Sequence, residues 1–160
     1  MGRPVAGAPP PYDRAVTEYH VGRLVDHVHL RVADLEASRR FYRAVLEAVG
    51  RELTWESESA FSSDELFVSA DGEPTRGLHL AFQAADREAV VRFHEAALAA
   101  GGRDNGRPGE RDYHPGYYAA YAFDPDGNNV EAVYHGPAER SAPSVVITAG
   151  RPERAPEPCP

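Results

Sequence analysis

The feature of this chain that most constrains its fold is an internal repeat. Residues 27–50 and 79–102, which lie 52 positions apart, are identical at 11 of 24 aligned positions. An excess of alanine explains some of these identities, but not the aligned histidine, aspartate, phenylalanine and glycine at His27/His79, Asp34/Asp86, Phe41/Phe93 and Gly50/Gly102. A module of about 50 residues that occurs twice is therefore predicted.

Both copies show the same order of local patterns. An apolar segment typical of a strand (24–32; 77–84) leads to an aspartate at a helix N-cap position, and a helix of 3.6-residue periodicity follows and ends at glycine. Short strands come next: 51–56, 59–63 and 65–70 in copy one, and 117–123 and 129–135 around a DPDGN turn in copy two. The prediction is an α+β fold of two βαβββ modules forming a curved mixed sheet around a central cavity.

Apolar residues at helical spacing predict which side of each helix is buried. In copy one the expected buried residues are Leu35, Tyr42, Val45, Leu46 and Val49. In copy two they are Val90, Phe93, Ala97 and Leu98.

Proline marks the two ends of the chain. Ten of the 14 prolines lie in residues 1–20 and 137–160, and such segments favour extended or disordered tails. The expected domain is residues 21–136, divided into modules at about 21–72 and 73–136. Within the C-terminal tail, the β-branched run 145–148 predicts a short edge strand.

Composition excludes several kinds of chemistry. All 17 basic residues are arginine and the one cysteine is Cys159, which excludes Schiff-base and phosphate-loop lysines and Cys-ligated zinc. A net charge of −8 with scattered arginines argues against a nucleic-acid partner. No apolar run approaches the roughly 20 residues of a membrane span, and we expect a cytoplasmic protein.

Three polar residues within apolar strands are the strongest site candidates: His27, His79 and Glu131. The repeat places the two histidines at equivalent points of their strands, so we expect them to face a common cavity, where Glu131 of the last strand can join them. Two imidazoles and a carboxylate suit a non-haem divalent metal with open positions for substrate. Ordinary core or surface histidines are the alternative interpretation.

Three further residues are candidates near this site. Tyr121 can lie opposite Glu131 across the hairpin and either donate a hydrogen bond to a substrate oxygen or fill the core. His114, in the preceding loop, is either an acid/base at the cavity mouth or simply exposed. Glu65 is the remaining carboxylate that copy one offers, as a fourth ligand or as a surface residue. We expect Tyr117 to serve packing.

The segments DHVHLRVADLEASRRFYRAVL, GLHLAF and HPGYYAAYAFDPDGNNVEAVYH resemble the vicinal oxygen chelate superfamily, which includes glyoxalase I, extradiol dioxygenases and bleomycin resistance proteins. The resemblance covers residues 24–136. It implies a divalent metal (Fe(II), Mn, Ni or Zn) on His27, His79 and Glu131, a small substrate that chelates it through adjacent oxygens, and a homodimer. Extradiol dioxygenases keep a tyrosine ten residues before the glutamate, where Tyr121 stands.

The chain departs from both enzyme patterns. Glyoxalase I has a fourth ligand at the end of its first module, where only Glu65 is available here. Extradiol dioxygenases hold an acid/base histidine between the two metal histidines, whereas residues 30–78 contain none. Dioxygenase, lyase and isomerase chemistry therefore stay open. The alternative function is a metal-free binder of an aromatic or cationic drug, and a structural or partner-binding module is a third.

Overall fold

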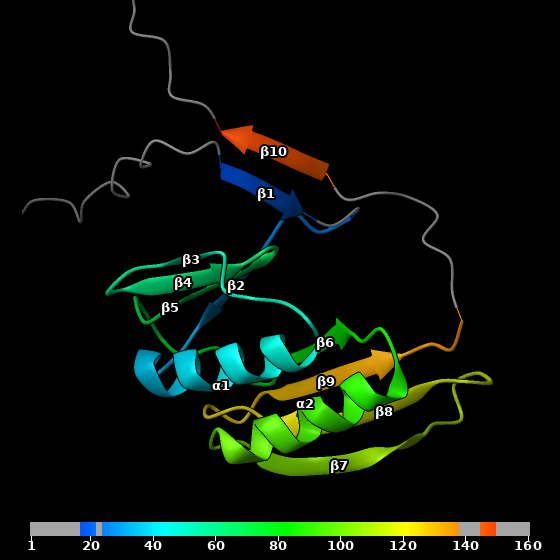
Figure 1. The fold of residues 1–160 in the computed structure, drawn as a ribbon. Coiled ribbons are helices and arrows are strands. Elements are labelled where there is room, and N and C mark those ends of the chain that lie inside the picture. Colours follow the sequence, from blue (N-terminus) through cyan, green and yellow to red (C-terminus); the bar gives the residue numbers. More distant parts are fainter. Residues whose placement is uncertain (1–16, 22–23, 138–144, 150–160) are drawn as a thin grey trace, which may run out of the picture.

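The structure, a computed structural model, describes residues 17–21, 24–137 and 145–149. Two helices and two four-stranded sheets form its main body (Figure 1). The helices are α1 (Leu35–Ala48) and α2 (Arg87–Ala99). The first sheet holds β2 (Val28–Arg31), β3 (Trp55–Glu56), β4 (Ala60–Ser63) and β5 (Leu66–Ser69). The second holds β6 (His79–Gln83), β7 (Arg103–Glu110), β8 (Tyr118–Phe123) and β9 (Asn129–Tyr134).

Each sheet is built from one copy of the repeat. The strand orders are β2-β5-β4-β3 and β6-β9-β8-β7, so both copies have the same connectivity. The first strand of each copy is parallel to the last and the other neighbours are antiparallel. The α+β fold of paired βαβββ modules is confirmed, although the strands form two open sheets and not one continuous sheet.

A separate two-stranded ribbon lies apart from these sheets (Figure 1). Strand β1 (Thr17–Val21) pairs with β10 (Val145–Ala149) in antiparallel fashion. Strand β10 agrees with the strand expected at 145–148, whereas β1 falls largely inside the segment 1–20 expected as an N-terminal tail. Residues 1–16, 138–144 and 150–160 of the two tails lie outside the described residues.

Both helices begin at the aspartates that the sequence indicates. The Asp34 carboxylate accepts a hydrogen bond from the Ala37 amide, and Asp86 accepts one from the Ala89 amide, which satisfies amides that have no partner within the helix. The helices pack side by side (Figure 1). Neither helix in the described part of the chain is long and apolar enough to cross a membrane.

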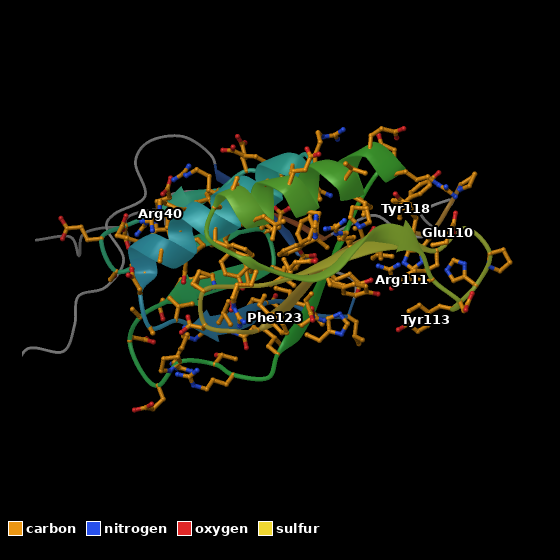
Figure 2. All side chains as sticks on the ribbon, turned by 90° about the horizontal axis from the view of Figure 1, so that it is seen from below. Arg40, Glu110, Arg111, Tyr113, Tyr118 and Phe123 are labelled. Carbon is orange, nitrogen blue, oxygen red and sulfur yellow. The ribbon has the colours of Figure 1, made fainter. Side chains whose placement is uncertain are left out.

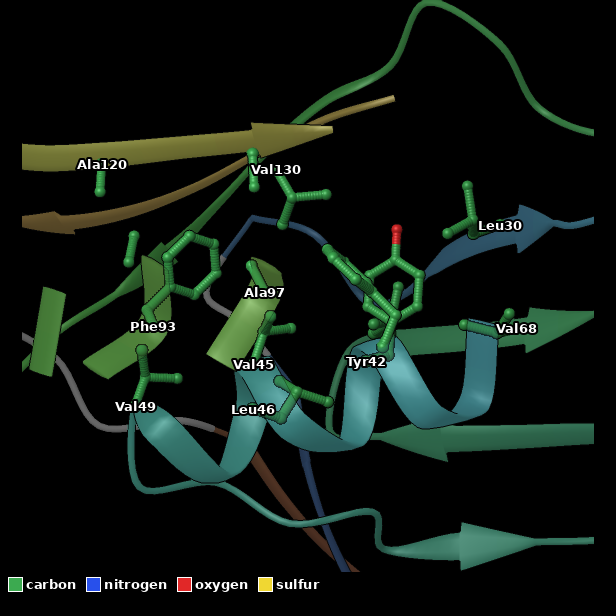
Figure 3. Close-up of a cluster of buried hydrophobic side chains, with 14 of the residues drawn as sticks. Leu30, Tyr42, Val45, Leu46, Val49, Val68, Phe93, Ala97, Ala120 and Val130 are labelled. Carbon is green, nitrogen blue, oxygen red and sulfur yellow. The ribbon is translucent and has the colours of Figure 1, made fainter. Parts of the chain in front are cut away.

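The core lies between the helices and the sheets (Figure 3). It contains four of the five residues expected from α1, while Leu35 packs partly buried against it. On α2 the expectation fails at Leu98, which is 41% exposed. His94 is buried in that helix instead and its Nε2 lies 2.9 Å from the Asp104 carboxylate. A polar side chain with such a partner can be buried at little cost.

The DPDGN turn is tied to the core through Asp124. This buried carboxylate accepts hydrogen bonds from the Tyr42 hydroxyl at 2.8 Å and from the Asn128 side chain at 3.1 Å. It also accepts from the Asp126 and Asn128 amides within the turn. Burial, followed by the charge of Asp124, raises the pKa of Tyr42 well above its usual value. The turn that connects β8 to β9 is therefore held firmly against α1.

Candidate functional site

The strand register of the second sheet brings the candidate residues of copy two onto one face. Tyr121 of β8 pairs directly with Glu131 of β9. His79 of β6 pairs with Asn129, two residues before Glu131, and residues two apart on a strand share a face. The imidazole of His79 and the ring of Tyr121 lie 6.2 Å apart between centroids. The hairpin therefore produces the same-face arrangement that its turn predicts.

Glu131 is a buried carboxylate with a partner on each oxygen. Its side chain is 3% exposed. One oxygen, Oε2, lies 2.8 Å from Nε2 of His79, and the other, Oε1, accepts a hydrogen bond of 2.7 Å from the Tyr117 hydroxyl. Buried carboxylates need such partners because their desolvation is costly. An imidazole and a carboxylate in contact are two donors that suit a divalent transition metal.

Tyr117 is the residue of this site that sequence reasoning missed. We expected a packing residue, yet its hydroxyl is the hydrogen-bond donor to Glu131. Burial, and then the hydrogen bond to Glu131, raise the pKa of Tyr117 far above its usual value, so the phenol is protonated at neutral pH. The signal was present in the alternation of the strand, since residues 117, 119 and 121 have the same parity.

His27 does not join His79 and Glu131 within one chain. It directly precedes β2 in the first sheet, its side chain is 63% exposed, and Nδ1 lies 2.7 Å from the Asp26 carboxylate. Among the described residues, no group of three histidine, cysteine or acidic side chains is close enough to hold a metal. In the described part of one chain, His27 therefore does not meet His79 and Glu131, because the two histidines belong to different sheets of the fold.

The first sheet has no carboxylate at the position that corresponds to Glu131. Glu131 pairs with Ala81 on β6, and the matching pair in the first sheet is Phe67 with His29. Phe67 makes an edge contact with His29 at 4.9 Å between ring centroids. Glu65 lies two residues earlier, next to β5. At this position the repeat thus has a carboxylate, Glu131, in copy two and an aromatic ring, Phe67, in copy one.

Tyr121 is held over a glycine of the neighbouring strand. A Cβ atom at Gly106, the partner of Tyr121 on β7, would lie 2.8 Å from the Tyr121 ring. Burial and then the charge of Glu131 raise the pKa of Tyr121, and the Arg111 guanidinium opposes this effect. Tyr121 is therefore a protonated phenol on the same face as the His79 and Glu131 pair.

His114 lies at the rim, in contact with Tyr117 and not with Glu131. Its ring packs edge-on against Tyr117 at 5.4 Å and stacks on His135 at 5.2 Å. Nδ1 donates to the Pro115 carbonyl, so in neutral His114 the other nitrogen, Nε2, accepts from Nδ1 of His135 at 2.9 Å. His114 and His135 form one coupled pair of imidazoles.

A cavity of about 640 Å³ lies beside this site rather than at it. Its lining comes from β6 (Leu80–Gln83), the end of α1, the β4–β5 turn with Glu65, and the segment before β2, where Leu24 is 95% exposed. His79, Tyr121 and Glu131 are not among the lining residues. The open face of the second sheet and this cavity are therefore two separate features of the described chain.

Comparisons with known proteins agree with this fold. The family described as the Glyoxalase/Bleomycin resistance protein/Dioxygenase superfamily matches residues 24–132. A Bacillus subtilis (strain 168) relative, the uncharacterized protein YqjT, is 33% identical over 126 residues, which cover 67% of this chain and 95% of the relative.

Comparison with solved structures also agrees with this fold. A glyoxalase/bleomycin resistance protein from Albidiferax ferrireducens T118 is 34% identical, with a TM-score of 0.60, over 69% of this chain and 98% of that one. A lactoylglutathione lyase from Agrobacterium tumefaciens shares the fold at 21% identity and a TM-score of 0.52, over 70% of this chain and 93% of that one.

Proposed function

Since the chain belongs to the Glyoxalase/Bleomycin resistance protein/Dioxygenase superfamily, we propose that it is a divalent-metal-dependent enzyme. Its substrate is a small molecule that chelates the metal through adjacent oxygens. The observation that carries this proposal is the contact of His79 with the buried Glu131 on an open sheet face. Burying a carboxylate costs free energy of desolvation, and a bound metal ion would offset this cost.

The proposed ligands are His27, His79 and Glu131. When bound, the divalent ion (Fe(II), Mn, Ni or Zn) supplies a Lewis acid that polarises substrate oxygens. Tyr121, protonated and on the same face, donates a hydrogen bond to the substrate. His114, at the rim and backed by His135, is the proposed acid/base. Whether the reaction is a dioxygenation, an elimination or an isomerisation depends on a substrate that these residues alone do not define.

A homodimer is part of the proposal because one chain keeps His27 apart from the other two ligands. In the proposed dimer, His27 of the partner subunit completes the site of His79 and Glu131. Two observations support this arrangement: the His79 side chain is 56% exposed on an uncovered face, and Leu24 and Val25, beside His27, are exposed apolar residues. Exposed apolar surface of this kind is typical of interfaces.

Metal content tests the function directly. The protein is purified without oxygen, loaded with metal, and compared with Glu131→Gln and with Glu65→Gln as a matched control. About one equivalent per chain in the wild type and in Glu65→Gln, with loss in Glu131→Gln, supports the proposal. A wild type that binds no metal refutes it and favours the alternative, a metal-free binder of an aromatic or cationic drug.

A mixing experiment tests the shared site. His27→Ala and Glu131→Ala chains are dissociated, mixed in equal amounts and reassembled. If each site takes residues from both subunits, random mixing regenerates one intact site in every mixed dimer, or about a quarter of all sites. If each site lies within one chain, mixing restores none, and the proposed arrangement is wrong.

A further inference from the structure

Two arginines lie over aromatic rings on the same sheet face as His79 and Glu131. The Arg111 guanidinium carbon is 5.3 Å from the ring centre of Tyr121, and that of Arg103 is 4.9 Å from the ring centre of Phe123. Tyr121 and Phe123 are two residues apart on β8, so their side chains share one face and their Cα atoms stand about 7 Å apart. The open face that carries the Glu131 carboxylate therefore also carries two cations.

Arg111 is held in place by the backbone and by an aromatic ring. Its Nη1 donates to the Glu110 carbonyl at 3.1 Å and its Nη2 donates to the Arg107 carbonyl at 2.7 Å. Gly109 leaves room for the group, since a Cβ there would lie 3.0 Å from Nη1. A guanidinium carries five N–H donors, so donors remain free after these two bonds. The group is thus oriented before any ligand arrives.

Neither arginine has a carboxylate partner among the described residues. Other arginines of the chain do: Arg31 pairs with Asp71, and Arg87 with Glu110. Arg111 is held by two backbone carbonyls and by the Tyr121 ring, and Arg103 lies over the Phe123 ring. An arginine fork that is oriented but not neutralised is the arrangement that proteins use to bind carboxylates and phosphates.

We infer that Arg111 forms a subsite for an oxyanion of the substrate, a carboxylate or a phosphate-type group, and that Arg103, over Phe123, adds a second cation to the same face. This inference rests on the proposed function, because it assumes that the adjacent oxygens of the same molecule reach the His79 and Glu131 pair. It specifies the substrate class as anionic. It also opposes the expectation of a cationic ligand that the acidic composition suggests, since the local field on this face has the opposite sign to the net charge.

Four catechol probes that differ in charge test the inference. Catechol is neutral, 3,4-dihydroxybenzoate adds a carboxylate, 3,4-dihydroxyphenylphosphonate adds a phosphonate, and dopamine adds an ammonium group. Each is titrated calorimetrically, under argon, into the full-length protein loaded with Zn²⁺, which does not change oxidation state. We expect at least one of the two anionic probes to bind about 10-fold or more tightly than catechol, because hydrogen bonds to a charged group are strong. The affinities of the two anionic probes then show whether the subsite prefers a carboxylate or a phosphate-type group.

Charge substitutions at one position assign the effect. In Arg111→Gln the affinity of the anionic probes falls to about the affinity of catechol. In Arg111→Glu dopamine becomes the probe that binds most tightly. Arg40→Gln makes the same change of charge on α1, at the opposite end of the molecule from Arg111 in Figure 2, and keeps the wild-type order of affinities. Circular dichroism of each variant verifies that it is folded, and Arg103→Gln replaces Arg111→Gln if the latter is not.

The outcomes separate the two proposals. If no probe binds the loaded protein, the proposed chelating function fails and the anionic subsite fails with it. If catechol binds but the anionic probes bind no more tightly, only the subsite is refuted. The subsite is also refuted if Arg40→Gln weakens the anionic probes as much as Arg111→Gln does, because the effect then comes from net charge.

Discussion

The hydrogen bond from Tyr117 to Glu131 gives the most direct test of the site geometry. Tyr117→Phe removes one hydroxyl and leaves the ring that packs against His114 and His135. The buried Oε1 of Glu131 then has no described donor. Leaving a buried polar group without a partner costs about 1–3 kcal/mol. Since Tyr117 is only partly buried, we expect a loss at the lower end, about 1–2 kcal/mol.

The matched control is Tyr118→Phe. Tyr118 is the neighbouring residue, half-buried on the opposite face of β8, where its ring carries the Arg87 guanidinium. We expect this variant to change the free energy of unfolding by less than about 0.5 kcal/mol. Urea denaturation followed by circular dichroism measures both variants. Equal losses in the two would show that the Tyr117 hydroxyl has no specific role.

Metal affinity provides a second measurement on the same pair. By donating to Oε1, Tyr117 leaves Oε2 as the oxygen beside His79. Hydrogen bonds that orient a ligand typically contribute 10- to 100-fold in metal affinity. Competition with a chelating dye should therefore show Tyr117→Phe weakened about 10-fold or more, with Tyr118→Phe unchanged. An unchanged affinity in Tyr117→Phe would contradict the orienting role.

The raised pKa of Tyr117 also has a defined consequence at alkaline pH. The pKa of Tyr117 is higher in the folded than in the unfolded chain. The contribution of protonated Tyr117 to stability is therefore complete below about pH 10 and declines as pH rises further. Absorbance at 295 nm follows tyrosine ionisation. Because the pKa of Tyr117 is raised, Tyr117→Phe should reduce the absorbance change only in the late part of the titration, above the usual pKa of tyrosine.

Three further predictions concern the metal and the core. Bound metal should leave as pH falls through about 6, since imidazole must be neutral to bind; metal retained at about pH 4 in equilibrium dialysis would argue against histidine ligands. Gly102→Ala should lower the free energy of unfolding by about 1–3 kcal/mol, because its Cβ would lie 2.6 Å from a core phenylalanine and under 3 Å from two backbone carbonyls. Gly72→Ala is the control, since only a flexible arginine side chain is near it. Asp124→Ala should cost about 2–4 kcal/mol, as it leaves the buried Tyr42 hydroxyl without its acceptor, whereas the exposed Asp112→Ala should have little effect on the thermal midpoint.

Local structure was largely predictable because its causes are local. The two helices, their aspartate caps and the DPDGN turn depend on neighbouring residues, and the structure confirms them, although α2 exposes Leu98 and buries His94. The βαβββ pattern implies a third strand in copy two, but the position of β7 was not identified, since its sequence RDNGRPGE contains residues that strands generally disfavour. Pairing with β8 at the sheet edge imposes its extended conformation, and a proline is tolerated at such an edge.

For the site, alternation and hairpin register already put Tyr121 opposite Glu131, and the repeat already put His27 and His79 at equivalent places. Equivalent places in two modules say nothing about how the modules pack, because packing depends on which surfaces α1 and α2 bury against each other. Only the tertiary structure separates His27 from Glu131, brings Tyr117 to that carboxylate and lays Arg111 over Tyr121. The sequence by itself determined two modules with a candidate metal ligand set; side-chain packing between distant segments decided which of those ligands meet in one chain.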